Sequence, residues 1–572
     1  MSAETINVGG GWRGFAVVAA FGLIAAGLTW RALDLGVLEN GFLLDQGAAR
    51  HLRVVPIPAH RGMITDRNGR PLAVSTPVDS IWVNPQDFTD FDRIGELAHA
   101  LGLPTKDVRA AITSHPDRQF LYLNREMNPA TANKVLALDL AGIHAEHEYR
   151  RYYPSGEVGA HVLGFTNIDD KGQEGLELSY NDWLRGTPGA ERVIKDRLGH
   201  IIQEVASLKE PKAGRDLVTS LDLRIQYLAY RDLKAAVAKQ GAKSGSIVVL
   251  DPNTGEVIAM ADQPAFNPNN RSDFHASLYR NRAVTDVFEP GSSFKPFGIA
   301  AALDSGKYTP ASTVDTSPGW WVVDGYTIKD HRNYGVINLT KLLEKSSNVG
   351  ASKIALTLTP EHMWQTFNAL GFGQYTGSGF PGERTGVLRP WQDWSRAGQA
   401  AVSYGYGVSV TTLQLTRAYA AIATGGIMHR ISFLRLDKQP VGHRVLPRKT
   451  ANDLRMMLET VVTKPGTGTL AEVPNYRVSG KTGTAHKAVD GGYSADHYTG
   501  VFCGMIPAEH PRLVSCVVIN DPSEGEYYGG LVAAPVFADV MTGAMRILDV
   551  PPDDISKEAT AKVIHLDQGG TS

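Results

Sequence analysis

A run of uncharged residues near the N-terminus constrains this chain more than any other feature. Between Arg13 and Arg31 lie 17 residues, GFAVVAAFGLIAAGLTW, without a single charge. As a helix this run spans about 25 Å, and Arg31 can snorkel so that the helix extends through Leu33 toward bilayer thickness. Trp12 and Trp30 lie near its two ends, where membrane interfaces favour aromatic side chains. The sequence therefore predicts a transmembrane helix here.

A cleaved signal peptide is the alternative, because Ala25–Gly27 resembles a weak cleavage site. The apolar run is longer than a signal-peptide core, so we favour an uncleaved anchor. Charge sets its orientation poorly, since the short N-terminal tail carries both Arg13 and Glu4 and the far side carries Arg31.

The composition of the 572 residues is that of a globular protein with room for more than one core. Net charge is −2, which gives no reason to expect a nucleic-acid partner. A phosphate-binding Gly-x-x-x-x-Gly-Lys loop is absent from the sequence, which argues against nucleotide chemistry. The segment HAEHE at 144–148 lacks an obvious third metal ligand, so we interpret it as a solvated charged segment and predict no metal or cofactor.

The only two cysteines are Cys503 and Cys516. Two cysteines cannot form a disulfide framework or a cysteine-based zinc cluster. Both lie in apolar runs, where buried free thiols are the first expectation. They could also be neighbours across a hairpin, but the sequence does not fix the register.

Turn signals and short β-type runs alternate from residue 56 to residue 189, as in a small mixed domain, and a linker-like segment follows at 207–215. Beyond it come a helix, a hairpin around Asn253–Gly255, several helices and late strands. This order predicts an α/β (α+β) domain whose antiparallel sheet is flanked by helices. The predicted boundaries are 1–13 for a tail, 14–33 for the anchor, 34–212 for a stalk and non-catalytic domain, 213–552 for the main domain and 553–572 for a C-terminal tail.

The segment EPGSSFKPFG places Ser292 after Pro-Gly and Lys295 three residues later. On a helix, positions i and i+3 share a face, so a desolvated lysine can take the proton of the serine hydroxyl and make it a nucleophile. The alternative is that Ser292 only begins an ordinary helix. Ser-x-x-Lys is expected about twice by chance in such a chain, so the pair alone decides nothing.

Two further motifs follow in the chain. Ser346 and Asn348 form Ser-x-Asn in EKSSNVG, and Lys481 begins Lys-Thr-Gly-Thr on a β-type stretch. Taken separately, the first could be a helix cap or a loop, and Lys481 could be an ordinary exposed lysine on an edge strand. All three motifs in this order are much less expected by chance.

The three motifs together resemble the signature of the penicillin-binding protein and serine β-lactamase superfamily. Segments outside the motifs, such as RGMITDRNGRPLA, RYYPSGEVGAHVLGF and VVLDPNTGEVIAMADQPAFNPN, resemble the class B penicillin-binding proteins. Within that class the chain is most similar to the division-type members, the penicillin-binding protein 3 group. The resemblance implies a transpeptidase domain of the serine β-lactamase type, preceded by a non-catalytic pedestal domain and one transmembrane helix.

The resemblance implies a peptidoglycan D,D-transpeptidase with the following roles. Ser292 attacks the bond between the two D-alanines of a donor stem peptide, and Lys295 is the candidate base. Ser346 relays a proton between Lys295 and the leaving amine, Asn348 binds a substrate amide, and Lys481 keeps the site electropositive.

Substrate-binding residues are also implied, and these are Thr482, Gly483, Thr484, His486, Tyr527 and Tyr528. Lys481 and Thr484 would hold the donor's terminal carboxylate, while the backbone N–H groups of Ser292 and Thr484 would form the oxyanion hole. Thr482 and Gly483 would complete the strand edge on which the substrate lies. Tyr527 and Tyr528 match an aromatic wall in these relatives, although aromatic residues there can also be plain packing.

One position departs from the family pattern. Division-type relatives often have arginine where this chain has His486. Arginine offers a permanently charged planar fork, whereas histidine is mostly neutral near pH 7. How this corner recognises a carboxylate, and how acylation depends on pH, are therefore left open.

The resemblance further implies a single-pass protein of the bacterial inner membrane with its catalytic domain in the periplasm, acting without a glycosyltransferase domain of its own in septal wall synthesis. Implied partners are the stem peptides, β-lactams, a polytopic glycosyltransferase and other division proteins. Two alternatives remain: a β-lactamase or β-lactam sensor, which shares all three motifs, and a catalytically silent scaffold of a wall-synthesis complex.

Overall fold

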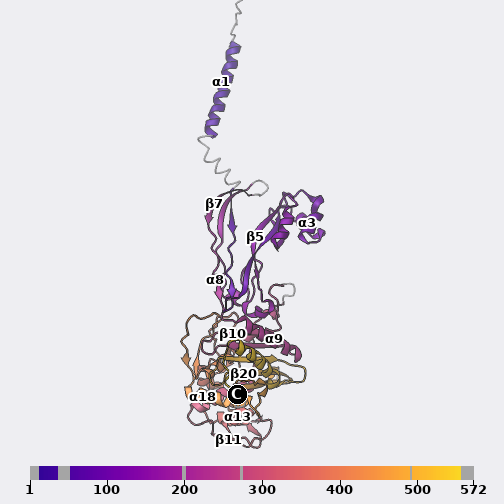
Figure 1. The fold of residues 1–572 in the computed structure, drawn as a ribbon. Coiled ribbons are helices and arrows are strands. Elements are labelled where there is room, and N and C mark those ends of the chain that lie inside the picture. Colours follow the sequence, from indigo (N-terminus) through magenta and orange to yellow (C-terminus); the bar gives the residue numbers. More distant parts are fainter. Residues whose placement is uncertain (1–11, 36–51, 196–200, 271–274, 490–491, 555–572) are drawn as a thin grey trace, which may run out of the picture. The chain divides into compact units, whose positions relative to one another are not determined.

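A computed structural model describes residues 12–35, 52–195, 201–270, 275–489 and 492–554 (Figure 1). The chain divides into two compact units. Unit 1 comprises Met1–His60, Pro77–Tyr149 and Gly186–Ala213, and unit 2 comprises Arg61–Thr76, Arg150–Arg185 and Gly214–Ser572. The boundaries predicted at 34–212 and 213–552 stay predictions, because each unit is built from separate stretches of chain.

The predicted anchor is confirmed as a long apolar helix, α1 (Trp12–Leu33). Its segment Gly14–Leu33 has a mean hydropathy of 1.7, and none of it is buried in the protein. A second segment, Gly529–Ile547, is also long and apolar enough to cross a membrane, but 56% of it is buried. Its apolar residues pack in the core of unit 2, so among the described helices α1 alone offers a bare apolar surface to a membrane.

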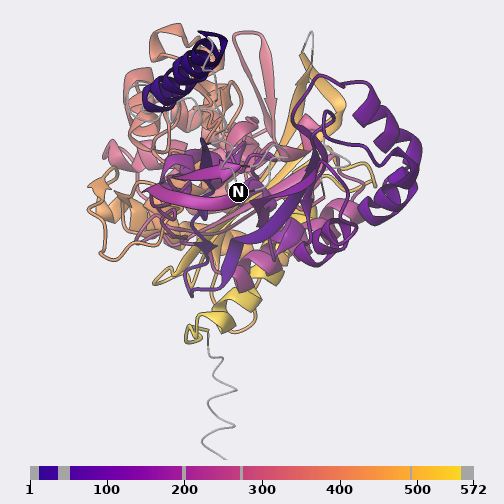
Figure 2. The ribbon, with the colours of Figure 1, turned by 90° about the horizontal axis from the view of Figure 1, so that it is seen from above.

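Unit 1 contains an antiparallel three-stranded sheet in the order β1-β6-β7, formed by β1 (Leu52–Ile57), β6 (Gly189–Lys195) and β7 (Ile201–Lys209). A second part pairs residues 79–83 of β3 (Pro71–Val83) with β4 (Leu121–Met127), and β5 (Ile143–Tyr152) also pairs with β3. Three short amphipathic helices cover this part with their apolar faces, on the right in Figure 2. They are α3 (Ile94–Leu101), α4 (Thr105–Thr113) and α5 (Pro129–Leu136).

The segment at 144–148 lies in β5, and the prediction that it is solvated is wrong for His144. This side chain is 9% exposed and lies against Trp82, with ring centroids 4.4 Å apart. Glu148 forms an ion pair with Arg125 at 2.5 Å. No group of three histidine, cysteine or acidic side chains that could hold a metal ion occurs among the described residues.

The main sheet of unit 2 has five antiparallel strands in the order β10-β9-β21-β20-β19 (Figure 1). They are β9 (Ser244–Leu250), β10 (Val257–Gln263), β19 (Ser479–Val489), β20 (Gly492–Ile506) and β21 (Leu513–Asn520). Successive side chains of a strand point to opposite faces. Val248 and Leu250 pack with α17 (Thr412–Ala423), whereas Ile247 and Val249 pack with α9 (Leu223–Lys239) and α20 (Ala534–Ile547). The predicted antiparallel sheet between helices is confirmed.

The remaining elements of unit 2 connect and cover this sheet. Its shorter strands are β2 (Ile64–Thr65), β8 (Leu217–Val218), β11 (Thr313–Asp315), β12 (Trp320–Val323), β13 (Tyr326–Lys329), β14 (Val336–Asn338), β15 (Val387–Leu388), β16 (Val408–Ser409), β17 (Ile427–Met428) and β18 (His443–Arg444). Its further α-helices are α6 (Ala160–Leu163), α7 (Gly175–Ser179), α8 (Asn181–Leu184), α10 (Ala276–Tyr279), α11 (Arg282–Thr285), α12 (Lys295–Asp304), α13 (Leu339–Lys345), α14 (Asn348–Ala355), α15 (Pro360–Ala369), α16 (Arg396–Ser403), α18 (Arg448–Val462) and α19 (Gly529–Val532).

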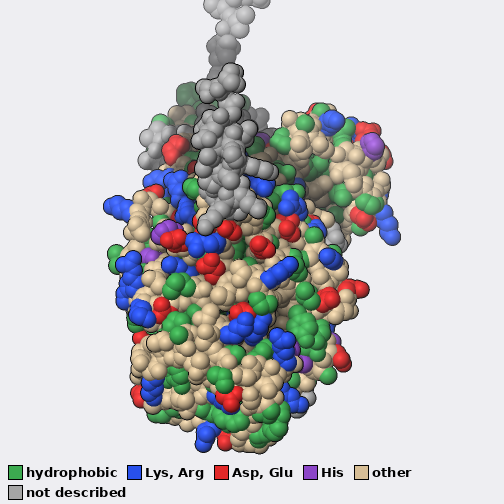
Figure 3. Space-filling model, turned by 60° about the horizontal axis from the view of Figure 1, so that its bottom comes forward, with side chains coloured by type: hydrophobic (Ala, Val, Ile, Leu, Met, Phe, Trp, Pro, Cys, Tyr) green, Lys and Arg blue, Asp and Glu red, His purple; other side chains and the backbone are tan. Residues whose placement is uncertain are grey.

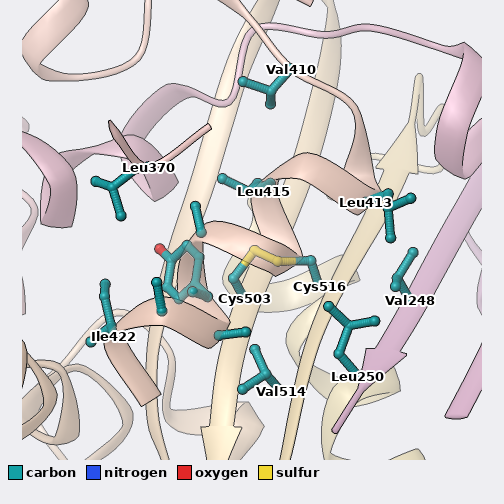
Figure 4. Close-up of a cluster of buried hydrophobic side chains, with 14 of the residues drawn as sticks. Val248, Leu250, Leu370, Val410, Leu413, Leu415, Ile422, Cys503, Val514 and Cys516 are labelled. Atoms are coloured by element: carbon teal, nitrogen blue, oxygen red, sulfur yellow. A yellow bond between two sulfur atoms is a disulfide. The ribbon is translucent and has the colours of Figure 1, made fainter. Parts of the chain in front are cut away.

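The two cysteines form a disulfide, so the expectation of free thiols is wrong. Cys503 of β20 lies directly opposite Cys516 of β21 in the antiparallel ladder. The register of these strands, which the sequence alone did not fix, therefore brings the two sulfur atoms together. Both residues are fully buried beside α17, among Leu413, Leu415 and other apolar side chains (Figure 4).

A buried ionic cluster lies in unit 2. Glu177 accepts hydrogen bonds from Arg61 Nε at 2.8 Å and from Arg151 Nε at 2.6 Å, and all three side chains have no exposed surface. Arg61 also donates to the carbonyl oxygens of Asp170 and Glu177. A buried charge persists only when it is paired and hydrogen-bonded, so these residues hold two separate segments of unit 2 together, Arg61–Thr76 and Arg150–Arg185.

Charged side chains are interspersed on the face of the protein in Figure 3, where Lys and Arg alternate with Asp and Glu. This mixture agrees with the net charge of −2. Charge recognition on this face therefore depends on local arrangements of side chains.

Candidate active site

Ser292 lies in a single turn of 3₁₀-helix, Gly291–Phe294, that immediately precedes α12. The α-helix itself begins at Lys295. Ser292 therefore lies in the turn before the helix and does not start it. Lys295 Nζ nevertheless lies 2.7 Å from Ser292 Oγ, as the spacing of three predicts. Gly291 has φ +53°, and a Cβ there would lie 2.8 Å from the carbonyl oxygen of Thr484. The turn is therefore packed directly against β19.

The surroundings of Lys295 favour an uncharged amine. Nζ lies 2.7 Å from the carbonyl oxygen of Ser346 and 2.7 Å from Asn348 Oδ1, and both atoms can only accept. A neutral amine donates to these two oxygens and keeps its lone pair for the Ser292 hydroxyl. Full burial and the nearby charge of Lys481 lower the pKa of Lys295 well below its ordinary value, although Asp330 opposes this.

Ser346 connects the two lysines. Its Oγ lies 3.0 Å from Lys295 Nζ and 3.0 Å from Lys481 Nζ. The residue caps the C-terminus of α13 in the left-handed conformation, at φ +60°. This backbone conformation costs a non-glycine residue free energy. Here it places the Ser346 hydroxyl between the two lysine amines. Burial lowers the pKa of Lys481 to about 7.

Asn348 is the first residue of α14, and its amide is fixed at both ends. Oδ1 accepts from Lys295, while Nδ2 donates to the carbonyl oxygen of Lys329 at 3.0 Å. Asp330 accepts from the Ser347 hydroxyl at 2.6 Å and from the Val349 backbone N–H at 3.0 Å, which places a carboxylate at the positive end of α14. No motif marked Asp330 in the sequence, because its role depends on hydrogen bonds to residues 17–19 positions later in the chain.

Strand β19 carries the third motif and has β20 on one side only, so its other edge is open among the described strands. Gly483 faces the serine turn, where a Cβ would lie 2.6 Å from the carbonyl oxygen of Pro290. Thr482 Oγ1 lies 2.9 Å from Thr467 Oγ1, and Thr484 Oγ1 accepts from the Gly529 backbone N–H at 3.1 Å. An open strand edge can take an extended peptide as an additional strand.

These elements enclose a cavity of about 430 Å³, which we call the catalytic cleft. Of the eleven residues predicted for the site, nine line it, and Lys295 and Lys481 lie fully buried beneath. The predicted residues in the lining are Ser292, Ser346, Asn348, Thr482, Gly483, Thr484, His486, Tyr527 and Tyr528. The sequence did not predict His331, Tyr406, Thr467, Tyr498, Gly530 and Leu531, which also line it.

Aromatic side chains form one wall of the catalytic cleft. Tyr498 stacks on Tyr527 at 4.0 Å between ring centroids, and Tyr528 lies 4.5 Å from Tyr527. His486 lies 4.7 Å from Tyr498, and its Nδ1 lies 2.8 Å from the carbonyl oxygen of Ser494. Because a carbonyl only accepts, this contact fixes a proton on Nδ1.

Comparison with known proteins identifies the family. The penicillin binding protein transpeptidase domain matches residues 245–542, and the penicillin-binding protein dimerisation domain matches residues 56–219. The chain belongs to the class B penicillin-binding proteins.

Its similarity to named relatives spans nearly the whole chain. The peptidoglycan D,D-transpeptidase FtsI of Escherichia coli K12 is 43% identical over 95% of this chain and 93% of its own. The probable peptidoglycan D,D-transpeptidase PbpC of Pseudomonas aeruginosa is 44% identical over 97% of this chain and 98% of its own. The structure of penicillin-binding protein 3 from Mycobacterium tuberculosis complexed with aztreonam covers 87% of this chain and 98% of that one, at 28% identity and a TM-score of 0.68. These relatives do not favour the β-lactamase, sensor or scaffold alternatives.

The catalytic cleft of this penicillin-binding protein is lined by no acidic side chain among the described residues. Glu344 pairs with Lys341 at 2.8 Å and with Lys345 at 3.1 Å. Glu289 accepts from the Gly407 backbone N–H at 2.7 Å and from the Tyr493 hydroxyl at 3.1 Å. Neither glutamate is therefore placed to activate water over an ester at Ser292.

Proposed function

We propose that this protein is a serine-type peptidoglycan D,D-transpeptidase in which Ser292 forms the acyl-enzyme. The contact of 2.7 Å between Lys295 Nζ and Ser292 Oγ carries the proposal, together with the burial and the nearby charge of Lys481 that lower the pKa of this amine. An uncharged lysine can take the serine proton as the oxygen attacks the carbonyl carbon between the two D-alanines.

The acylation step then balances as follows. Ser292 Oγ forms a bond to the carbonyl carbon, its proton passes to Lys295 Nζ, and the resulting oxyanion is held by the N–H groups of Ser292 and Thr484. The bond to the terminal D-alanine breaks, and its nitrogen receives a proton from Lys295 through Ser346, whose hydroxyl lies 3.0 Å from both lysines. The acyl group leaves Ser292 when the amine of a second stem peptide attacks.

The surrounding residues bind the donor. The open edge of β19 takes the donor as an added strand, Asn348 binds its amide, and Lys481 and Thr484 hold its terminal carboxylate. Thr482 and Gly483 shape that edge, and His486, Tyr527 and Tyr528 contact the rest of the donor. A β-lactam reaches Ser292 by the same route and leaves a stable ester.

The helix α1 and the named relatives support a proposal for where the protein acts. We propose that the catalytic domain lies in the periplasm, anchored by α1 in the inner membrane, and that the protein serves septal wall synthesis with a polytopic glycosyltransferase and other division proteins. The similarity to FtsI supports the division role.

Labelling with a fluorescent penicillin tests the function. We expect one label on the full-length protein and none on Ser292→Ala. Ser305→Ala, which removes a hydroxyl at the other end of α12, is the matched control and should label like the native protein. A Ser292→Ala protein that still binds one covalent penicillin would refute the assignment.

A further inference from the structure

A second cavity, of about 710 Å³, lies in unit 2. We call it the second cleft. Its walls come from the segment 285–289 before the serine turn, from residues 485–488 of β19, from the start of β9, from Thr499 in β20, and from the end of β21. It is larger than the catalytic cleft, and none of the steps described above uses it.

The second cleft is continuous with the catalytic cleft at His486, which lines both. Thr484 lines only the catalytic cleft, and the next residue, Ala485, lines only the second. Because neighbouring side chains of a strand point to opposite faces, β19 forms the wall between the two cavities. A molecule bound in the second cleft therefore lies one strand away from the site of the chemistry.

The two acidic groups of the second cleft already have partners in the protein, although Glu289 Oε2 is buried without a hydrogen-bond partner. Asp286 pairs with Arg280, Nε to Oδ1 at 3.0 Å, and with Arg282, Nη1 to Oδ2 at 3.2 Å. Glu289 is bound by the Gly407 N–H and the Tyr493 hydroxyl, and burial raises its pKa. Asp286 is thus already paired with two arginines, and the burial of Glu289 favours its uncharged form.

Two cations of the lining remain for a ligand. Arg384 is exposed, and its guanidinium has no ion pair with any side chain of the described part of the chain. Lys487 Nζ is 3.9 Å from Asp521 Oδ2, but Asp521 is also held by Lys243 and by His497 at 2.7 Å. The four basic side chains of the lining thus exceed its two acidic ones, and the excess favours an anionic ligand.

We propose that the second cleft binds the acceptor stem peptide, with Arg384 and Lys487 contacting its carboxylates. This inference rests on the proposed transpeptidase function. The reaction needs two peptides at once, and the donor occupies the catalytic cleft. The acceptor is itself a stem peptide, so it carries at least the carboxylate of its terminal D-alanine.

The acceptor reaches the acyl-enzyme at Ser292 past His486, where the two clefts join. The acceptor amine forms a bond to the acyl carbon, the bond from that carbon to Ser292 Oγ breaks, and the proton lost by the amine returns to Ser292 Oγ through Lys295. To reach Ser292, the acceptor's chain must pass His486, the residue that lines both clefts. An extended chain of a few residues can cross one strand, because each residue spans about 3.3–3.6 Å. Hydroxyls in the lining, including Ser244, Ser409 and Thr499, can bind its peptide groups.

The test uses the full-length protein in detergent and separates the two half-reactions. Acylation by penicillin measures the donor side. Transfer from a thioester donor to an amine-bearing stem peptide measures the acceptor side, with two acceptors that differ only in a C-terminal carboxylate or carboxamide. The variant is Arg384→Glu, and Arg389→Glu is the control, because Arg389 is exposed nearby and lines neither cleft.

We expect Arg384→Glu to lower the transfer rate to the carboxylate acceptor at least about tenfold, the size of a lost charged contact. Penicillin acylation should change less than about twofold, and the carboxamide acceptor should be affected far less than the carboxylate one. Arg389→Glu should behave like the native protein in all three assays.

Unchanged transfer to the carboxylate acceptor in Arg384→Glu would overturn the inference, and so would an equal loss with both acceptors. A comparable loss of penicillin acylation would overturn it too, because the substitution would then act on the donor side. Absence of both acylation and transfer in the native protein would instead refute the proposed function.

Discussion

At the scale of single residues, the two buried lysines set the pH dependence of acylation. The reactive form pairs a neutral Lys295 with a charged Lys481. Neutral Lys295 forms as the pH rises through its lowered pKa, whereas Lys481 loses its charge as the pH rises through a pKa of about 7. We therefore expect the second-order rate of penicillin acylation to rise and then fall, with its alkaline limb near neutral pH. A rate that climbs steadily to pH 10 would contradict this assignment, provided that thermal unfolding shows the protein folded over that range.

The motif residues were predictable because each lies at a fixed distance along the sequence from its functional partner. Lys295 follows Ser292 by three positions, and Asn348 follows Ser346 by two. Asp330, Tyr406 and Tyr498 escaped prediction, because each reaches the site alone from a segment with no spacing rule. The disulfide escaped for a related reason: opposite placement of two cysteines depends on register, which packing along the whole of β20 and β21 decides.

At the scale of elements, the contact between β19 and the serine turn is the one that assembles the site. Gly483→Ala would place a Cβ 2.6 Å from the Pro290 carbonyl oxygen and 3.0 Å from the Ser293 side chain, so strand and turn must separate. We expect penicillin acylation to fall at least about tenfold, because misplacement of about 1 Å has large effects on rate. Gly95→Ala on α3, where nothing lies within 4 Å of an added Cβ, is the control and should leave the rate unchanged.

The buried ionic cluster predicts a large stability effect far from the chemistry. Glu177→Ala leaves Arg61 and Arg151 charged and buried without their carboxylate. We expect it to lower the free energy of unfolding by about 3–5 kcal/mol. Lys449→Ala, which removes an exposed lysine from its pair with the partly buried Asp453, should cost less than about 1 kcal/mol. Equal melting temperatures for the native protein and Glu177→Ala would show that the cluster is dispensable.

At the scale of the whole molecule, the sequence predicted the fold class because each layer has its own pattern: an uncharged run for α1, and alternating apolar strands between helices in unit 2. It could not predict that unit 2 includes Arg61–Thr76 and Arg150–Arg185, because that grouping depends on long-range contacts such as the Glu177 cluster.

The distribution of apolar surface predicts how the protein behaves without its anchor. A chain shortened to begin at Leu35 loses α1 and keeps every residue of the catalytic cleft. We expect it to be soluble without detergent, since the other long apolar segment is 56% buried, and to be acylated by penicillin within about twofold of the full-length rate. Aggregation that only detergent prevents, seen by light scattering, would reveal a second membrane-binding surface.

The central claim is that Ser292 forms an ester which this site protects from water, and intact-mass spectrometry tests it directly. The described lining of the catalytic cleft holds no carboxylate that could activate water. A β-lactamase lowers the hydrolytic barrier by several kcal/mol, and each ~1.4 kcal/mol is tenfold in rate. After excess penicillin is removed at neutral pH, we expect one penicilloyl adduct, located on the Ser292 peptide, to persist for at least tens of minutes. Recovery of the free protein within seconds, or an adduct on any other residue, would contradict the assignment.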